Sequence, residues 1–327
     1  MIKIIIKKTG EITAEEWDQI TGGFNSEFIK DKRPEDLKKY YEATVLGFSY
    51  HALALAETGE FAGHTTFAPM FYKQKNGERI LTVLSGGSYV KKKFRSDIFI
   101  FKEMYMALAE SAKNDGVLAV LGVPNKNSFK YFTKLLNAKF LYNLPYYVLP
   151  LRLNKLVQNK TASVFSFLIL FAVKCYLHTL HIFSFFFNSK EKQIFFTIDY
   201  SEVAFRQRFN ETYNTVETGK YRFTYKIYNE KDISTAYIFD FTESGERTSR
   251  SLIRCCNYIA CKEKADLLAF VGRLDLTQPV LMKLPVKKEP QQLPLTIDVL
   301  ADYDHPLFEE LGNTANWNFG LMNFDVR

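Results

Sequence analysis

The stretch from Lys91 to Asp97 has the residue types of an anion-binding site. It reads Lys-Lys-Lys-Phe-Arg-Ser-Asp, and it lies between a strand-like segment ending at Val90 and a segment whose apolar residues recur at helical spacing. Four cations directly before a helix N-terminus suit phosphate, because the unpaired backbone amides and the helix dipole attract an anion in the same direction. The alternative is a solvated charged turn in which Ser96 or Asp97 caps an ordinary helix.

Residues 1–150 predict a sheet and helices that would position this turn. Strands are expected at Ile2–Ile6, Gly47–Ala56, Phe61–Tyr72, Arg79–Val90, Val117–Val123 and Phe140–Leu149. Helices are expected at Ala14–Ile20, after a Thr13/Glu16 capping-box pattern, and at Pro34–Ala43, Ile98–Ala112 and Ser128–Leu136. The basic turn would therefore join a hairpin strand to a long helix.

From Val90 to Phe140 the chain resembles the core of the GNAT superfamily of acyl-CoA-dependent N-acyltransferases. In that family a strand leads into an Arg/Gln-x-x-Gly-x-Gly/Ala loop whose amides hold the CoA pyrophosphate, and Phe94–Phe99 occupies that loop here. Pro124–Phe140 is similar to the family segment N-x-x-S-x-x-x-Y-x-K-L-G-F, and the element order of residues 1–150 is similar too. The resemblance implies an α/β (α+β) fold and acyl transfer from a thioester to an amine.

The same resemblance implies a site for acetyl-CoA or another acyl-CoA as co-substrate, without a metal. The residues that would bind it are Tyr89, Val90, Lys92, Lys93, Phe94, Arg95, Ser96, Asp97, Ile98, Asn125 and Ser128. The cations would hold the phosphates, the asparagine and serine would line the pantetheine side, and strand amides near Val90 would polarise the thioester carbonyl. Tyr131 and His64 are the candidate catalytic residues, as proton donor to the thiolate and as general base.

The chain also departs from the family pattern. The loop lacks the family's glycines, and Phe132 stands where the family has its proton-donating tyrosine, one position from Tyr131. Ile80–Val90 contains no carboxylate, which leaves His51 or His64 as the base, although either could equally be a strand histidine with structural partners. These departures motivate a second hypothesis, a non-catalytic GNAT-fold binding or scaffold protein.

Residues 191–327 repeat part of the first pattern, with strands expected at Tyr221–Tyr228, Thr235–Phe241 and Leu267–Val271 and a helix at Thr248–Cys261. Phe205–Phe209 and Trp317–Asp325 look like degraded segments of tandem GNAT-like proteins, which include N-myristoyltransferases and Fem-type aminoacyl transferases. The latter suggest a third hypothesis, a Fem-type aminoacyl transferase that uses charged tRNA.

The predicted organisation is therefore an N-terminal GNAT-like acyl-CoA-binding lobe at residues 1–155, an apolar connecting helix at 156–190 and a degenerate GNAT-like lobe at 191–327. Each lobe would hold a mixed, largely antiparallel sheet flanked by helices.

Val164–Phe187 is almost wholly apolar and long enough to cross a bilayer. Lys174, His178 and His181 form one polar stripe, which Ser163 and Ser166 extend. Three interpretations remain open: a helix packed between two domains, an interfacial membrane helix, or a true membrane span. We favour the first, because a single polar stripe is typical of a helix that is buried on its other sides.

Composition and charge exclude several classes of protein. A 327-residue chain with 47% hydrophobic residues is not intrinsically disordered. The net charge of +7 arises within the first 200 residues, where an anionic partner should bind, but no basic stripe recurs, so nucleic acid is not expected. The four cysteines form no C-x-x-C pair and are expected to be buried thiols.

The apolar N-terminus is too short for a signal peptide, and we expect a cytoplasmic protein. Its acceptor would be a small-molecule or lipid-linked amine, and 164–187 is a candidate for peripheral membrane contact.

Overall fold

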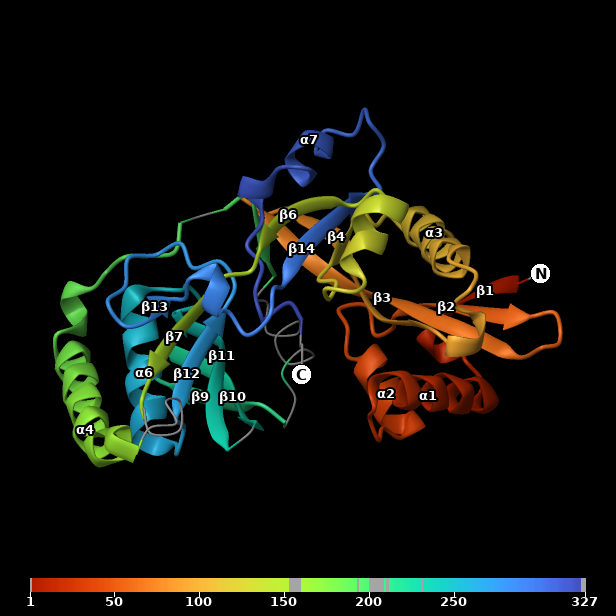
Figure 1. The fold of residues 1–327 in the computed structure, drawn as a ribbon. Coiled ribbons are helices and arrows are strands. Elements are labelled where there is room, and N and C mark those ends of the chain that lie inside the picture. Colours follow the sequence, from red (N-terminus) through yellow and green to blue (C-terminus); the bar gives the residue numbers. More distant parts are fainter. Residues whose placement is uncertain are drawn as a thin grey trace. The chain divides into compact units, whose positions relative to one another are not determined.

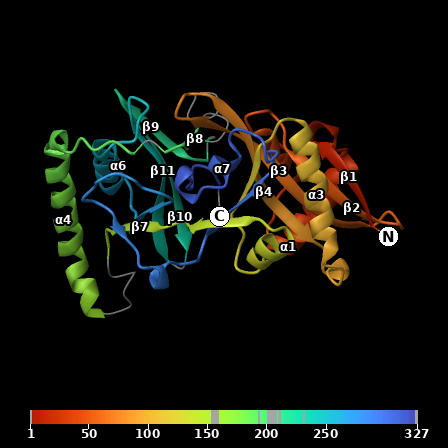
Figure 2. The same ribbon diagram turned by 90° about the horizontal axis from the view of Figure 1, so that it is seen from above.

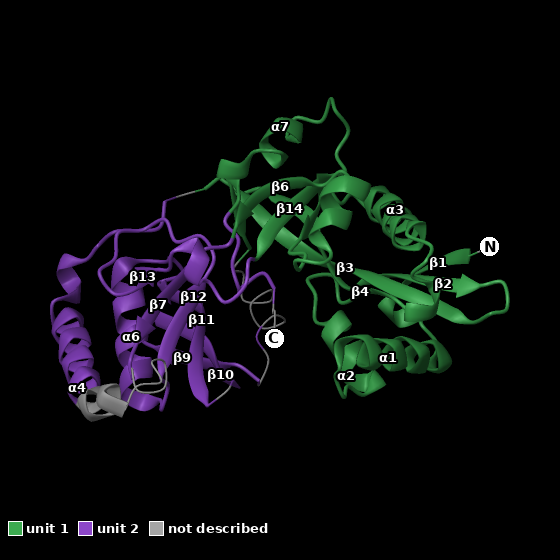
Figure 3. Cartoon of the chain, in the orientation of Figure 1, with its two compact units in different colours: residues 1–143, 194–208, 293–317 green, residues 144–193, 209–292, 318–327 purple. Residues whose placement is uncertain are grey.

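The computed structural model describes residues 2–152, 160–192, 194–199, 209, 212–230 and 232–324. The chain forms two compact units, and each unit draws on three separate stretches of sequence (Figure 3). Unit 1 comprises residues 1–143, 194–208 and 293–317, and unit 2 comprises residues 144–193, 209–292 and 318–327. The predicted domains were contiguous, so the observed units differ from them: the chain passes repeatedly from one unit to the other.

Unit 1 is built on an eight-stranded sheet with the order β1-β2-β3-β4-β5-β14-β6, and β8 pairs with β3 (Figure 1). Its strands are β1 (Ile2–Lys8), β2 (Tyr50–Ala56), β3 (Phe61–Gln74), β4 (Arg79–Val90), β5 (Ala119–Gly122), β6 (Lys139–Asn143), β8 (Phe196–Ile198) and β14 (Pro294–Val299). Neighbouring strands are antiparallel except β4 and β5, which are parallel. The five strands predicted from Ile2 to Val123 are all present.

Helices cover both faces of this sheet. They are α1 (Ala14–Phe28), α2 (Pro34–Glu42) and α3 (Phe99–Asn114), with 3-10 turns at Thr9–Glu11 and Lys92–Phe94, a π turn at Tyr131–Leu135 and the short elements α7 (Phe308–Leu311) and Thr314–Asn316. Side chains alternate along β2, so that Tyr50 and Ala52 pack with α3 while Leu53 packs with α1 and α2. Figure 2 shows α3 running over the strands of unit 1. The predicted capping box is present, because Thr13 Oγ1 accepts a hydrogen bond from Glu16 N.

The chain leaves unit 1 directly after β6. The predicted single strand Phe140–Leu149 is wrong: β6 lies in the sheet of unit 1, whereas β7 (Tyr146–Pro150) lies in the sheet of unit 2. Pro145 separates them, because proline has no N–H for a strand ladder, and its carbonyl accepts a hydrogen bond from Gly272 N at 3.0 Å. In the other direction β14, from late in the chain, enters unit 1 between β5 and β6. The units thus exchange strands.

Unit 2 contains a six-stranded sheet with the order β13-β7-β12-β11-β10-β9. The remaining strands are β9 (Asn214–Thr218), β10 (Tyr221–Glu230), β11 (Ile233–Glu243), β12 (Leu267–Val271) and β13 (Met282–Lys283), the helices are α4 (Lys160–Ile182) and α6 (Ser249–Lys262), and 3-10 turns lie at Ser184–Phe186 and Val286–Lys288. Helix α6 packs on the sheet, and α4 packs on α6 (Figures 1 and 2). Helix α4 is thus a layer of unit 2. Among the described residues, no helix has both the length and the apolar character required to cross a membrane.

The two units share an internal repeat. In unit 1 the β3–β4 hairpin is followed by α3 and by β5 parallel to β4, and in unit 2 the β10–β11 hairpin is followed by α6 and by β12 parallel to β11. The second strand of each hairpin carries a bulge, at Gly87–Ser88 and at Phe239. The predicted fold class, two lobes with mixed, largely antiparallel sheets flanked by helices, is confirmed. Of the two segments compared above with tandem proteins, Phe205–Arg208 and Asp325 lie outside the described residues.

Candidate functional site

Strands β4 and β5 diverge partway along β4. Their parallel ladder pairs Thr82–Ser85 with Ala119–Gly122, whereas β4 continues to Val90. The rest of β4 pairs with β3 on one side, and no strand among the described residues pairs with it on the other side. Backbone groups on the other edge of β4 are therefore left outside the sheet ladder, where a ligand can hydrogen-bond to them.

The diverging part of β4 contains the bulge. Gly87 and Ser88 of β4 stand opposite a single residue of β3, Thr65. Gly87 has a φ of +59°, and a Cβ at this position would lie 2.4 Å from Tyr41 Oη. Both the left-handed backbone and the close tyrosine therefore require glycine. The strand predicted at Arg79–Val90 contained no bulge, although the Gly86-Gly87 pair inside a strand pattern is the signal for one.

The basic turn after β4 is partly neutralised by acidic side chains of unit 1. Arg95 forms an ion pair with Glu27, and its Nε donates to Val90 O at 2.8 Å. Lys93 Nζ lies 2.6 Å from Glu60 Oε2. The Lys93–Glu60 pair is exposed, and a pair of this kind contributes only about 0–1 kcal/mol, so a phosphate could replace Glu60. Glu27, in contrast, has only 16% of its side chain exposed.

Asp97 interacts with the start of α3, as in the capping alternative for this turn. Its Oδ1 accepts a hydrogen bond from Phe99 N at 2.9 Å. Lys92, Ser96 and Ile98 are exposed. The negative charge of Asp97 is thus directed to a backbone amide of α3. Phosphate binding by this turn stays a prediction.

Asn125 and Ser128 are brought together in the turn that follows β5. Asn125 Oδ1 accepts from the backbone N–H groups of Asn127 and Ser128, at 3.0 and 2.9 Å, and lies 3.1 Å from Ser128 Oγ. Phe129 N donates to Asn125 O at 2.9 Å, as at a helix N-terminus. The asparagine thus organises the turn, and its contact with pantetheine stays a prediction.

Tyr131 and Phe132 have opposite environments. Phe132 is buried, with its ring centroid 6.0 Å from that of Tyr105, and a Cβ on Gly122 would lie 2.8 Å from the Phe132 ring. Tyr131 is 44% exposed. The residue at the family's tyrosine position therefore belongs to the core, and the neighbouring phenol is the one that solvent reaches.

His64 is fully buried in a hydrogen-bonded pair. Its Nε2 lies 3.0 Å from His51 Nδ1, and His51 Nε2 lies 3.0 Å from Thr9 Oγ1. The rings of Tyr41 and Tyr89 pack around the pair. Burial lowers the pKa of His64 to about 3 and lowers the pKa of His51 well below its usual value. These surroundings fit a structural strand histidine better than a general base, which needs a pKa near the working pH.

The equivalent junction in unit 2, between β11 and α6, is filled by the chain's own side chains. Thr248 and Ser251 form a capping box at the start of α6. Glu243 Oε2 accepts from Thr248 Oγ1 at 3.1 Å, and Glu243 Oε1 lies 3.1 Å from Arg250 and 2.5 Å from Lys220. Glu243 and the side chains bound to it thus occupy this helix N-terminus. The repeat therefore leaves unit 1 as the candidate for an anionic co-substrate.

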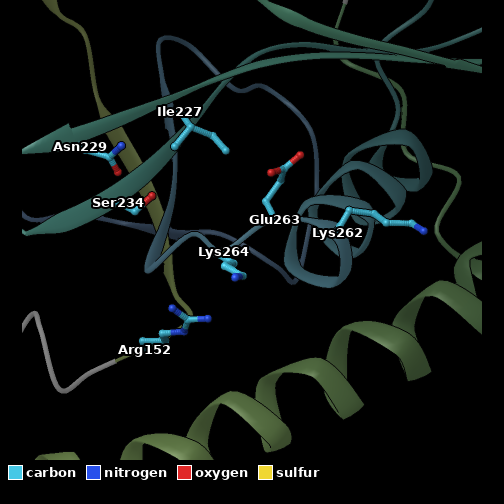
Figure 4. A pocket seen from close by; sticks show the side chains of 7 residues that line it. All are labelled: Arg152, Ile227, Asn229, Ser234, Lys262, Glu263 and Lys264. Carbon is cyan, nitrogen blue, oxygen red and sulfur yellow. The ribbon is translucent and has the colours of Figure 1, made fainter.

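Unit 2 also contains an open hollow, shown in Figure 4. It is lined by Arg152, Ile227, Asn229, Ser234, Lys262, Glu263 and Lys264. Two of its charged side chains have partners: Arg152 lies 3.4 Å from Asp266, and Glu263 accepts from Tyr225 Oη at 2.5 Å. The hollow adjoins the C-terminus of α6, so it lies away from the junction that corresponds to the site in unit 1.

Within the described ranges, no three His, Cys, Asp or Glu side chains are grouped as metal ligands. All four cysteines are unpaired. Cys255 and Cys256 are buried, as predicted, whereas Cys175 and Cys261 are exposed, so the prediction of buried thiols is wrong for these two.

Comparison with known proteins identifies the fold. No family model matches the sequence, and no curated protein matches it significantly. Solved structures do match: a GCN5-related N-acetyltransferase from Kribbella flavida (TM-score 0.55, 11% identity, 91% of this chain and 71% of that one), one from Anabaena variabilis (0.54, 10%, 91% and 73%) and Eis1 from Mycobacterium abscessus (0.53, 9%, 92% and 74%). The fold is GNAT-like over almost the whole chain, and the predicted resemblance is confirmed at the level of fold.

Proposed function

We propose that unit 1 binds acetyl-CoA or another acyl-CoA and transfers the acyl group to an amine. The observation that carries this proposal is the divergence of β4 from β5 at the Gly87–Ser88 bulge, followed at once by a basic turn and the start of α3. Such an arrangement offers unpaired strand amides, cations and a helix N-terminus in one place. Unit 2 would bind no second acyl-CoA, since Glu243 and its partners occupy its own junction.

The residues present fit this co-substrate in most respects. Lys92 is exposed, Lys93 can exchange its exposed partner Glu60 for phosphate, and about half of the Arg95 side chain is exposed beside its partner Glu27. An acyl-CoA supplies a thioester, whose carbonyl oxygen the backbone amides near Tyr89 and Val90 would stabilise while the amine attacks the carbonyl carbon. The carbon–sulfur bond would then break, with Tyr131 donating its proton to the departing thiolate. The amine would lose its proton to water, and Tyr131 would regain a proton from water, so that the products are the amide and the free thiol.

Thermal denaturation with acetyl-CoA, CoA and longer acyl-CoAs tests the assignment. A ligand at 100 times its dissociation constant should stabilise the protein by about 2.7 kcal/mol. Arg95→Ala should reduce this stabilisation. Arg33→Ala is the matched control, because Arg33 is likewise exposed and paired with a carboxylate, that of Asp36, at 3.0 Å. Absence of any shift at millimolar concentrations of all three ligands would contradict the proposal.

A second candidate function is a binding or scaffold protein without catalysis. The burial of His64, whose pKa is near 3, favours this second function. The only other base predicted in this half of the chain is its partner His51, which is equally buried. Release of free thiol from acetyl-CoA in the presence of a panel of amines separates the two. Turnover that falls in Tyr131→Phe supports the transferase, and ligand binding without turnover for any amine supports the scaffold.

A further inference from the structure

Helix α4 is apolar on two opposite faces. Its inner face packs into the core of unit 2 through Leu170, Val173, Leu177 and Leu180. Its outer face exposes Leu168 (59%), Phe171 (61%) and Ile182 (55%), which are spaced at helical intervals. The sequence pattern predicted that α4 is buried on every side except its polar stripe. Unit 2 covers the inner face of α4 but leaves this outer face exposed.

Three exposed phenylalanines extend this outer face past the end of α4. Phe183, Phe185 and Phe186 are 48%, 58% and 72% exposed, and the rings of Phe185 and Phe186 lie 4.0 Å apart. Their backbone is held in place: Ser184 is buried, and Arg250 donates to Ser184 O at 3.2 Å and to Phe185 O at 3.3 Å. The rings are therefore presented by an ordered turn.

We call these exposed side chains the α4 ridge, defined as Leu168, Phe171, Ile182, Phe183, Phe185 and Phe186. Single exposed hydrophobic residues are common on soluble proteins, but a cluster of large ones, such as Ile182, Phe183, Phe185 and Phe186 here, marks a surface that binds something.

The charges around the α4 ridge indicate the chemistry of its partner. Helices α4 and α6 together contain five lysines and arginines and no aspartate or glutamate. More widely, residues 144–190, which all belong to unit 2, contain five lysines and arginines and no acidic residue. Lys174 is partly buried and lies along α4 between Phe171 and Ile182. An apolar face within a positive region matches an anionic lipid surface, where aromatic rings settle at headgroup level and cations meet the lipid phosphates.

We propose that the α4 ridge binds the surface of an anionic lipid bilayer, with α4 lying in the plane of the interface. A second copy of this chain is the less suitable occupant. A symmetric contact would bring the positive charges of the two Lys174 side chains toward one another. The proposal is independent of acyl transfer, because all of its residues lie in unit 2.

Flotation of the full-length protein with lipid vesicles tests this proposal. Binding should be strong to vesicles of phosphatidylcholine mixed with phosphatidylglycerol, weak to phosphatidylcholine alone, and reduced by high salt. The triple variant Phe171→Ser, Phe185→Ser, Phe186→Ser should lower partitioning at least about tenfold, since burial of one phenylalanine already corresponds to a tenfold change or more. Lys174→Gln should lower it roughly fivefold, the effect of one cation near an anionic surface.

The matched control is the pair Ile29→Ser and Tyr303→Ser, which removes hydrophobic side chains that are 93% and 83% exposed in unit 1. It should bind vesicles like the unmodified protein. Circular dichroism establishes that each variant is folded. Equal vesicle binding by the triple variant and the control would overturn the proposal. Equal binding to neutral and anionic vesicles would also overturn it. A third contrary result would be that neither protein binds vesicles while light scattering shows a dimer that the triple variant abolishes.

Discussion

Replacement of Gly87 by alanine tests the role of the β4 bulge. The backbone at this position is left-handed, which costs roughly 1–2 kcal/mol for a residue with a Cβ. The new Cβ would also lie 2.4 Å from Tyr41 Oη, and overpacking of a buried site typically costs about 1–3 kcal/mol. Together these effects predict that Gly87→Ala lowers the free energy of unfolding of unit 1 by about 2–5 kcal/mol. It should also weaken the stabilisation by acetyl-CoA, because the amides beside the bulge are displaced.

Urea unfolding monitored by tryptophan fluorescence measures this change in unit 1 specifically. The chain has two tryptophans, Trp17 and Trp317, and both lie in unit 1. Gly86→Ala is the matched control, because no atom lies within 4 Å of its added Cβ and its φ is ordinary. This control should change stability by less than about 1 kcal/mol. If the two variants were equally stable, the bulge would not depend on glycine at Gly87, and our account of the site would be refuted.

Three further outcomes are expected. The native state holds His64 neutral, with a pKa of about 3 against about 6.5 when unfolded, and burial lowers the pKa of His51 as well, so the unfolded state binds more protons below pH 6.5. The contribution of these histidines to the stability of unit 1 should be constant above pH 6.5 and should fall as the pH is lowered toward 3, with His64 alone accounting for up to about 1.4 kcal/mol per pH unit. Tryptophan-monitored unfolding should show a shallower fall in His64→Gln. Glu27→Gln should free Arg95 and tighten CoA binding by up to about fivefold in calorimetry, whereas an unchanged affinity would argue against a phosphate contact by this arginine. Thr248→Ala should remove the α6 cap and cost about 1 kcal/mol, seen as roughly fivefold faster hydrogen exchange in α6, with no CoA site gained in unit 2.

Local sequence patterns predicted most elements of unit 1 because their signals are local. The Thr13/Glu16 box starts α1, and Tyr105, Leu108 and Ala112 lie on the buried face of α3 as their spacing indicated. Ile98, assigned to the same face, is instead exposed before the helix begins. Helix ends depend on capping contacts that periodicity does not report.

The candidate site was predicted less well than the fold. The turn with Asn125 and Ser128 is present because its hydrogen bonds connect near neighbours in sequence. The partners of Arg95 and His64 could not be predicted, because Glu27 and His51 approach them from other elements. Burial of His64 then determines its pKa, a property that residue type alone leaves open.

The sequence by itself determined that two related α/β halves exist, that the first carries the basic turn, and that residues 164–187 are too apolar for an ordinary surface helix. These properties depend on residues close together in the chain. Only the tertiary structure decided that β7 and β14 are exchanged between the units, since strand partners are selected by packing and hydrogen bonding over long sequence distances. The tertiary structure also decided which face of α4 is covered by the rest of unit 2. The packing of α6 against α4 determines which phenylalanines and cations of α4 and its C-terminal turn stay exposed, and the helical pattern of the sequence does not specify this packing.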